Sequence, residues 1–291
     1  MAIRIDTPAD FEFLECINAH GWRQLLPFSW DTESNTLHRV EEFGVDGIAA
    51  LSLRGEAGVV KVDVTGSAPE SEIIRRVRHM LQLDLSLDEF HSYCADRPQL
   101  SHVPSLRQGR LLRSPTLAED VLKVIATTNT TWSQTKGMIA RIVDSFGTPL
   151  PADQSRRSFP RPEQIAAVPL ADFASKARMG YRSASVHRIA TEIAEGRLDL
   201  ESWQDPAIPS ADLYKRLLSL PGIGPYAASC LMIYLGRYDR VNVDSWARTM
   251  VGKELGRPIT DNEVHDFFEP YGEWKALVYQ FYKWKENPPE Y

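Results

Sequence analysis

Cysteine is scarce in this sequence, and the metal-binding side chains form no close cluster. The 291 residues include three cysteines, Cys16, Cys94 and Cys230, which lie far apart and form no CxxC pair. The seven histidines form no HExxH pair. A structural zinc ion or a cysteine-ligated iron–sulfur cluster needs closely spaced ligands of this kind. We therefore expect no iron–sulfur cluster, no required cofactor, and free thiols in a reducing compartment.

Sequence motifs of several other protein classes are also missing. There is no GxxxxGKS/T loop and no GxSxG turn, which argues against a nucleotide-driven motor and a serine hydrolase. The apolar runs are too short to cross a bilayer, and residues 1–13 contain acidic side chains and no apolar signal segment. We expect an intracellular protein with no membrane segment, in the cytoplasm or nucleoid, or in the nucleus if the source is eukaryotic.

The charged residues are unevenly distributed along the chain. The net charge is -6, but residues 106–190 hold 13 Lys and Arg against 6 Asp and Glu. Residues 1–105 hold 9 against 17, and residues 191–291 hold 11 against 16. A basic middle of this kind can form a phosphate-binding face despite the acidic total. The alternative is that these charges are spread over solvated helix faces.

The first third of the chain has the pattern of a small α/β domain. Short, partly alternating runs at 36–43, 47–54 and 58–65 are separated by glycine-containing breaks and predict an antiparallel meander. A helix is expected to start near residue 69. The polar, proline-containing stretch at 96–109 is predicted to be a linker.

From Ser114 onward the pattern is helical almost to the end of the chain. Ser114 and Pro115 suit the cap and first position of a helix. Further helices are predicted at 131–146, 162–168, 184–195, 211–219, 225–235, 245–254, 261–268 and 273–284. The predicted fold class is therefore α+β, with an N-terminal antiparallel domain over 1–105 followed by a mostly α-helical domain over 106–291.

Two of the predicted helices flank a short segment rich in glycine and proline. This segment is Leu220-Pro221-Gly222-Ile223-Gly224, and Pro225 suits the first position of the second helix. Glycine allows positive φ and close approach of the backbone to another surface. The hairpin amides and the following helix N-terminus can then bind a phosphate, while Ile223 is expected to enter the core. An ordinary interhelical turn is the alternative.

Asp244 follows the hairpin at a distance of twenty residues. It ends the segment Val241-Asn242-Val243-Asp244 and directly precedes a predicted helix. A single Asp in such a place is usually a helix N-cap. The combination with the hairpin favours a second role for its carboxylate.

With hairpin and aspartate in place, the sequence resembles the helix-hairpin-helix DNA glycosylases, the superfamily named for its Gly/Pro-rich hairpin and catalytic Asp. Other segments match, in order, 3-methyladenine DNA glycosylase II and 8-oxoguanine DNA glycosylase. They are Gln82–Leu87, Arg110–Arg113, Thr128–Asn129, Gly137–Met138, Gly180–Arg182 and Tyr271–Trp274. The resemblance covers most of the chain and implies a helical glycosylase domain after the N-terminal sheet.

By this resemblance Asp244 is the catalytic carboxylate. Cleavage of a glycosidic bond builds positive charge on the sugar, which an ionised carboxylate stabilises, and the same group can activate a water molecule. Tyr226, Trp274 and Cys230 are predicted to line the base pocket. Tyr279 and Tyr282 are more readily explained as core residues, because aromatic residues at helical spacing usually pack inside.

The resemblance also implies contacts with double-stranded DNA that contains a damaged base. Gly222, Gly224 and Ala227 would offer backbone amides to a phosphate. Asn129 would fill the space left by the flipped base, and Arg182 would read or support the opposite strand; a structural role is the alternative for both. The carbonyl groups of three hairpin residues would hold a monovalent cation, Na⁺ or K⁺. These residues are Leu218, Leu220 and Ile223.

Some positions depart from the pattern of the 8-oxoguanine enzymes. Those enzymes have a nucleophilic lysine two residues after the second hairpin glycine, where this sequence has Tyr226. Ala276 and Gln280 replace the Gln and the Phe, respectively, that hold 8-oxoguanine, and Trp246 replaces a His that contacts phosphate. We therefore expect a monomeric, monofunctional glycosylase without lyase activity that excises alkylated purines. The alternatives are an oxidised-purine glycosylase and a non-catalytic helix-hairpin-helix DNA-binding protein.

Overall fold

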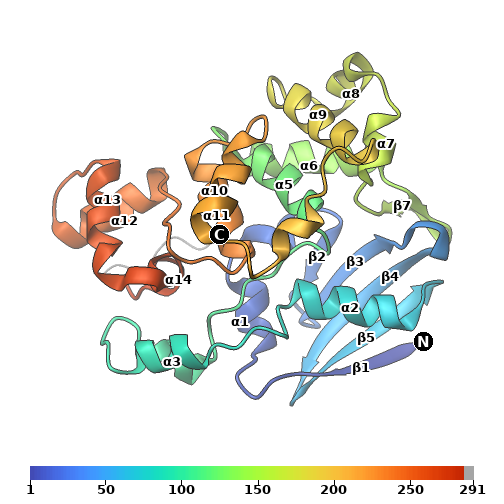
Figure 1. Ribbon diagram of the computed structural model, residues 1–291. Helices are drawn as coiled ribbons and strands as arrows, with labels where there is room; N and C mark the ends of the chain where they lie inside the picture. The colour runs from blue at the N-terminus through green and yellow to red at the C-terminus, as the bar shows by residue number, and fades with distance from the viewer. Residues whose placement is uncertain (285–291) are drawn as a thin grey trace. The chain divides into compact units, whose positions relative to one another are not determined.

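The computed structural model describes residues 1–284 and forms two compact units (Figure 1). The first unit consists of residues 1–85 and 110–204, and the second of residues 86–109 and 205–284. The division of the sequence into domains 1–105 and 106–291 stays a prediction. Within the described residues no helix is long and apolar enough to cross a membrane.

A five-stranded antiparallel sheet forms the base of the first unit. Its order is β1-β5-β4-β3-β2. The strands are β1 (Ala2–Asp6), β2 (Phe28–Asp31), β3 (Thr36–Glu42), β4 (Ile48–Glu56) and β5 (Val59–Gly66), with a 3-10 turn, η2 (Gly44–Asp46), between β3 and β4. The meander β3-β4-β5 was predicted, whereas the outer strands β1 and β2 were missed. β1 forms by pairing with the distant β5, from Ala2 opposite Asp63 to Asp6 opposite Val59.

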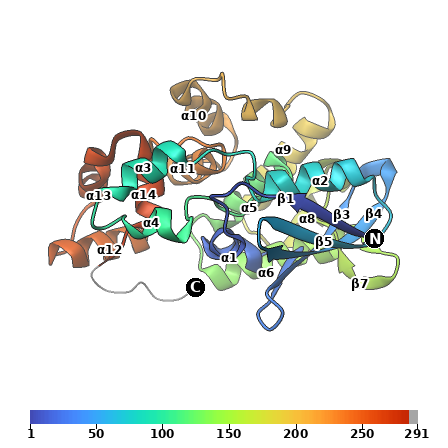
Figure 2. The ribbon, with the colours of Figure 1, turned by 90° about the horizontal axis from the view of Figure 1, so that it is seen from below.

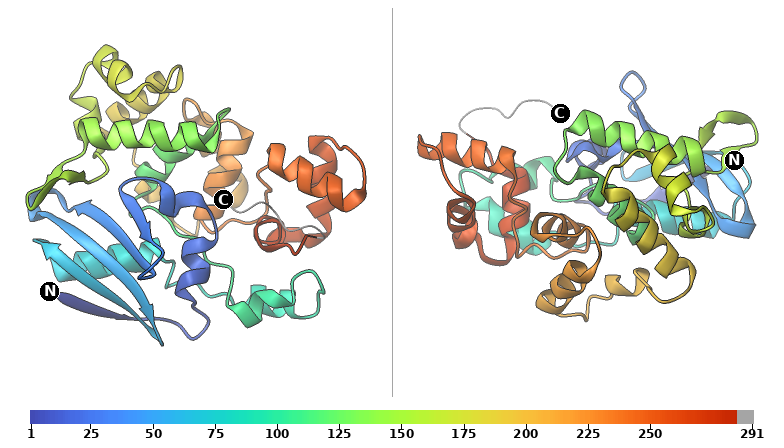
Figure 3. Two further views of the ribbon diagram at one scale, coloured as in Figure 1. Left: turned by 180° about the vertical axis from the view of Figure 1, so that it is seen from behind. Right: turned by 90° about the horizontal axis from the view of Figure 1, so that it is seen from above.

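Helix α2 (Glu70–Met80) covers one face of this sheet, as the front and back views show (Figures 1 and 3). It begins beside Pro69, as predicted, and its fully buried residues recur every three or four positions: Ile73, Val77 and Met80. This spacing gives a helix one apolar stripe, and in α2 this stripe is buried.

The first unit contains further helices outside the sheet, several of which Figure 2 labels. They are α1 (Phe13–Asn18), η1 (Gly21–Gln24), α5 (Leu117–Thr127), α6 (Trp132–Phe146), α7 (Pro162–Ala166), α8 (Leu170–Ala177), α9 (Arg182–Ala194) and η3 (Glu201–Gln204), with the hairpin β6 (Pro149–Leu150) and β7 (Asp153–Arg157). The prediction that Ser114 caps the first of these long helices is wrong. Thr116 caps α5 instead, since its hydroxyl accepts a hydrogen bond from the Glu119 N–H at 3.2 Å. Helix α8 was not predicted.

All regular elements described in the second unit are helices. These are α3 (Asp88–Ala95), α4 (His102–Leu106), α10 (Ser210–Ser219), α11 (Pro225–Tyr234), α12 (Ser245–Leu255), α13 (Asp261–Phe268), η4 (Glu269–Trp274) and α14 (Lys275–Phe281). The predicted linker at 96–109 contains α4, because Leu100 and Val103 are apolar enough to be fully buried. The predicted helix at 273–284 is shorter: α14 ends at Phe281, with Tyr282 extended.

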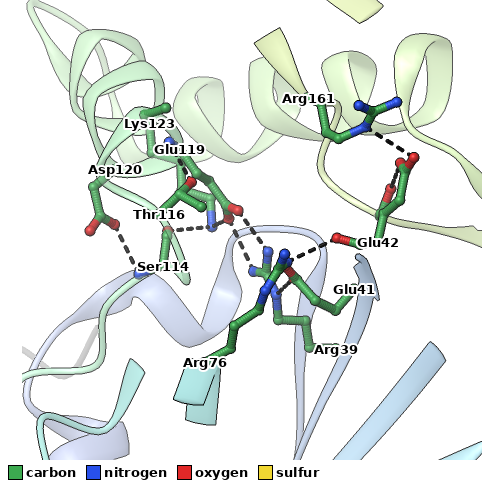
Figure 4. Close-up of polar contacts among 12 residues, drawn as sticks. Arg39, Glu41, Glu42, Arg76, Ser114, Thr116, Glu119, Asp120, Lys123 and Arg161 are labelled. Carbon is green, nitrogen blue, oxygen red and sulfur yellow. Dashed lines mark hydrogen bonds and ion pairs between the residues drawn. The ribbon is translucent and has the colours of Figure 1, made fainter. Parts of the chain in front are cut away.

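A buried group of charged side chains connects the sheet of the first unit to α5 (Figure 4). Glu119 of α5 accepts hydrogen bonds from Arg39 of β3 at 3.0 and 2.6 Å and is paired with Lys123, one turn further along, at 2.6 Å. Arg39 also binds Glu41, which in turn contacts Arg76 of α2. Because each buried charge has an oppositely charged partner, the cost of burial is offset within the group.

Candidate functional site

The segment between α10 and α11 is a tight hairpin, as predicted. Helix α10 ends at Ser219, Leu220 is extended, and the Ile223 N–H donates to the Leu220 carbonyl at 3.2 Å. Gly222 has φ 82°, in the region that favours glycine. Ile223 is 6% exposed, so its side chain enters the core of the second unit and anchors the hairpin from inside.

The two hairpin glycines form the outer surface of this turn. Gly222 and Gly224 are exposed, and Gly224 precedes Pro225, the first residue of α11. A Cβ atom added at Gly224 would meet no described atom within 4 Å. The first amides of a helix have no partner within it, so the start of α11 offers donors next to an unobstructed surface. Ala227 lies in this first turn, with its side chain buried.

The predicted cation ligands are arranged around the same hairpin. Leu220 and Ile223 are buried and Leu218 is 38% exposed. The Leu220 carbonyl already accepts one hydrogen bond, from Ile223, and retains a second lone pair. Carbonyl oxygens are suitable ligands for a hard cation. Its binding stays a prediction.

Asp244 is the N-cap residue of α12. Its backbone is extended, and its Oδ1 atom accepts a hydrogen bond from the Ala247 N–H at 2.8 Å. The carboxyl group is half-buried. Burial raises the pKa of Asp244 above its ordinary value, while hydrogen bonds from the Ala247 and Trp246 amides oppose this shift. The cap hydrogen bond therefore fixes the orientation of a carboxylate in a partly dehydrated place.

Cys230 interacts with the charge of Asp244 and with the side chains of Tyr226 and Asn242, and we call the four residues Tyr226, Cys230, Asn242 and Asp244 the Asp244 cluster. Tyr226 and Cys230 are four residues apart on one face of α11. Burial raises the pKa of the Cys230 thiol to about 12; hydrogen bonds from Tyr226 and Asn242 oppose the shift, and the negative charge of Asp244 adds to it. The cluster thus joins two of the predicted pocket residues to the predicted catalytic group.

Asn242 was missed as a site residue. Its Oδ1 atom is buried and has no hydrogen-bond partner among residues 1–284. The signal was present in the sequence, since a polar residue stands between Val241 and Val243 just before Asp244.

Trp274, the third predicted pocket residue, packs within the second unit. Its ring stacks on Tyr238 with centroids 5.9 Å apart and lies 5.3 Å from Phe90. It is half-buried. Tyr279 and Tyr282 are buried, in keeping with a core role.

Trp246 and the remaining departures from the family pattern also lie in the second unit. The Trp246 ring meets Tyr279 and Trp284 edge-on. Its Nε1 atom is buried and lacks a partner within the described part of the chain. Ala276 is fully buried, and its N–H donates to the Tyr238 carbonyl at 2.8 Å. Trp246 thus packs α12 against Tyr279 of α14, and Ala276 joins the start of α14 to Tyr238.

The two remaining predicted DNA contacts, Asn129 and Arg182, lie in the first unit. Asn129 is exposed and has φ 46°. Arg182 is only 8% exposed, and its guanidinium group donates to the carbonyls of Thr128 and Asn129. The structure brings these two residues together.

Comparison with known proteins gives relatives over nearly the whole chain. No protein-family model matches. A probable N-glycosylase/DNA lyase of Methanothermobacter thermautotrophicus is 22% identical over 259 residues, which are 80% of this chain and 81% of that protein.

Several solved structures are also similar. MBOgg1 in complex with a low-affinity DNA ligand has a TM-score of 0.77 at 20% identity, over 96% of this chain and 93% of that one. The 8-oxoguanine glycosylase/lyase of Clostridium acetobutylicum has a TM-score of 0.76 at 18% identity, over 96% and 94%. The 3-methyladenine DNA glycosylase of Archaeoglobus fulgidus has a TM-score of 0.74 at 17% identity, over 96% and 97%. The chain thus has the fold of the helix-hairpin-helix DNA glycosylases, which confirms the resemblance and the α+β fold class inferred from its sequence.

Proposed function

We propose that this protein is a DNA glycosylase of base-excision repair, which acts as a monomer on double-stranded DNA and hydrolyses the N-glycosidic bond of a damaged base. The observation that carries the proposal is the Asp244 carboxylate, half-buried and fixed at the start of α12, in a chain that also has the Gly/Pro-rich hairpin predicted to bind phosphate. Binding of the DNA backbone alone would not require a carboxylate there.

The chemistry follows from the position of Asp244. As the bond to the base breaks, positive charge develops on the deoxyribose, and an ionised carboxylate in a partly dehydrated site stabilises it strongly. The Ala247 N–H holds one carboxylate oxygen at 2.8 Å, so the group need not reorient during the reaction. The same carboxylate can orient or deprotonate the attacking water.

The target base has to leave the helix before this chemistry can begin. Amides of Gly222, Gly224 and Ala227 would hold the backbone phosphates, and Asn129 would occupy the space left in the base stack. The pocket for the extruded base would be formed by Tyr226 and Cys230, with Trp274 as a further wall.

The reaction is proposed to be monofunctional. A lyase needs an amine that forms a Schiff base with the sugar, and the phenol of Tyr226 cannot do so. The archaeal relative is named a glycosylase/lyase, and so is the Clostridium enzyme. The proposal rests on the residue at position 226 rather than on those names.

Alkylated purines are the proposed substrates. Tyr226 gives the predicted pocket an aromatic surface, which suits stacking of an electron-poor alkylated base. Oxidised purines are the second candidate. Two features favour them: the structural similarity to 8-oxoguanine glycosylases, and Cys230, which by the family resemblance matches a cysteine of the 8-oxoguanine pocket.

A lesion panel tests this proposal. Duplexes that each carry one alkylated purine, one 8-oxoguanine or one undamaged base are incubated with excess protein, and the released base is measured. We expect release of alkylated purines and an intact abasic strand. Release of 8-oxoguanine alone would select the second candidate. Tight binding without release from any duplex would instead indicate a non-catalytic DNA-binding protein.

A further inference from the structure

The connection between α5 and α6 is a short loop with an unusual backbone. Thr128 is the extended C-cap residue of α5, and Asn129 follows with φ 46°, in the left-handed region that few residues other than glycine and asparagine adopt readily. Such a conformation persists only where neighbouring groups hold it.

Arg182, the first residue of α9, supplies that support through its guanidinium group. Its Nε donates to the Thr128 carbonyl at 3.1 Å, and its Nη2 donates to the Asn129 carbonyl at 3.0 Å and also to Thr128. Its Nη1 donates to the Met179 carbonyl at 3.3 Å. One rigid guanidinium group therefore joins the end of α5 to the turn before α9.

Tyr181 contacts the side chain of Asn129. Its hydroxyl accepts a hydrogen bond from the Asn129 Nδ2 at 3.3 Å, and its ring lies 4.5 Å from the centre of the Arg182 guanidinium. Tyr181 is 65% exposed, so this hydrogen bond is on the surface. We call Thr128, Asn129, Tyr181 and Arg182 the Asn129 clamp.

We infer that Arg182 is a positioning residue that fixes Asn129 in its working conformation before DNA binds, and that it does not read the base opposite the lesion. This inference rests on the proposed function and on the predicted role of Asn129 in filling the base stack.

Burial and hydrogen bonding both support this assignment. Arg182 is 8% exposed, and all three guanidinium nitrogens donate to protein carbonyls. To reach a base, the side chain would have to leave these carbonyls without their donor, which is costly for buried groups. A loop that is already ordered loses less conformational entropy when Asn129 enters the duplex.

A double-mutant cycle tests the inference. Single-turnover excision and affinity for a duplex with an abasic-site analogue are measured for Arg182→Met, Asn129→Gly and the double variant. Glycine at 129 removes the side chain but tolerates the left-handed backbone. We expect each single variant to lose about tenfold in excision, the size of effect of one missing hydrogen-bonding group. The double variant is expected to lose little more than either single variant.

Further variants and substrates distinguish positioning of Asn129 from recognition of the opposite base. The loss in Arg182→Met should be equal with each of the four bases opposite the lesion and should shrink on an unpaired lesion. Arg182→Lys should lose as much as Arg182→Met, because one ammonium group cannot bridge the carbonyls; it also serves if the Met variant is unstable in a thermal melt. Arg188→Met, on the exposed face of α9, is the matched control, with no expected coupling to Asn129.

Additive losses in the cycle, or a loss that depends on the opposite base, would overturn the inference. Retained activity in Arg182→Lys would do the same, because it would show that charge alone is sufficient. If the wild-type protein released no base, the proposed function would fail. The affinity cycle on abasic-analogue DNA would still decide whether Arg182 acts through Asn129.

Discussion

Asp244 has two roles at the level of the single residue. It caps α12 through the Ala247 N–H, and its half-buried carboxylate is the proposed catalytic group. Asparagine caps helices about as well as aspartate, whereas alanine does not. The cap and the charge can therefore be separated by substitution.

Asp244→Asn is expected to retain the fold and abasic-site binding but to lose at least about a hundredfold in excision, since stabilisation of the developing cation is removed. Asp244→Ala should be equally inactive and also less stable, by about 1 kcal/mol. Single-turnover assays and denaturant melts measure the two effects, with Asp212→Asn on exposed α10 as the control. Wild-type rates in Asp244→Asn would show that the carboxylate is not catalytic.

The raised pKa of Asp244 predicts a pH dependence with a defined sign. Excision should fall as the pH drops through a pKa above 3.8, the ordinary value, because the carboxylate becomes protonated. The same burial penalises the ionised form in the folded state. Its contribution therefore opposes folding above the unfolded pKa and vanishes below it. Asp244→Asn should lack both the activity step and this pH-dependent penalty in its melting curves.

Tyr226 predicts the type of reaction. Borohydride reduction during turnover should trap no covalent protein–DNA adduct, because no amine stands at position 226 to form a Schiff base. Denaturing gels show such adducts directly, and the Clostridium glycosylase/lyase provides a positive control. An adduct that disappears when one lysine is replaced would contradict the monofunctional assignment.

At the level of elements, the hairpin between α10 and α11 combines a buried anchor with an exposed backbone. Ile223 fixes it from inside, while the glycines form its outer surface. Their backbone conformations differ. Gly222 has φ 82°, whereas Gly224 has φ −100°, which any residue can adopt.

Substitution of the two glycines should therefore have different consequences. Gly224→Ala is expected to leave the melting temperature unchanged but to weaken binding to lesion and undamaged duplex alike, because the methyl group would obstruct the approaching phosphate. Gly222→Ala should in addition destabilise the fold by about 1 kcal/mol or more, from strain at positive φ. Equal DNA affinity of Gly224→Ala and wild type would argue against phosphate binding at the hairpin.

The buried charges between the sheet and α5 predict an effect on stability (Figure 4). Burial alone would raise the pKa of Glu119, but the charges of Arg39 and Lys123 lower it to about 2. Its stabilising contribution is thus present above the unfolded value of 4.5 and is lost as the pH falls toward 2. Glu119→Gln should cost about 3–5 kcal/mol at neutral pH, as measured by urea melts, and less at pH 3. A constant difference would exclude this electrostatic origin.

At the scale of the whole molecule, the net charge of -6 opposes binding to DNA, and the basic block at 106–190 has to overcome it. Lys176 and Arg178 belong to that block, are exposed, and lie a few residues before Tyr181 and Arg182 of the Asn129 clamp. They are therefore candidates for contacts with phosphates.

Lys176→Gln and Arg178→Gln should each lower DNA affinity uniformly across sequences and reduce the slope of log affinity against log salt by about 1. Fluorescence anisotropy at several salt concentrations measures both quantities. Arg4→Gln and Arg75→Gln remove similarly exposed charges from outside the block and serve as controls. The basic block would lose its assigned role if all four variants behaved alike.

Local pattern was sufficient for many features of this chain. The helices α10 to α13 follow from apolar spacing, and the hairpin with its two glycines and the cap at Asp244 is encoded within one continuous segment. Such features depend on contacts between residues a few positions apart, which a sequence displays directly.

Tertiary contacts decided the rest. Strand β1 exists because it pairs with β5, and α4 forms where a linker was expected because Leu100 and Val103 find a core to enter. The sequence marks Arg182 as a basic residue, but only the packing of α9 beneath the end of α5 buries it under the Thr128 and Asn129 carbonyls. Each outcome depends on residues brought together from distant parts of the chain, whose pairing no local pattern specifies.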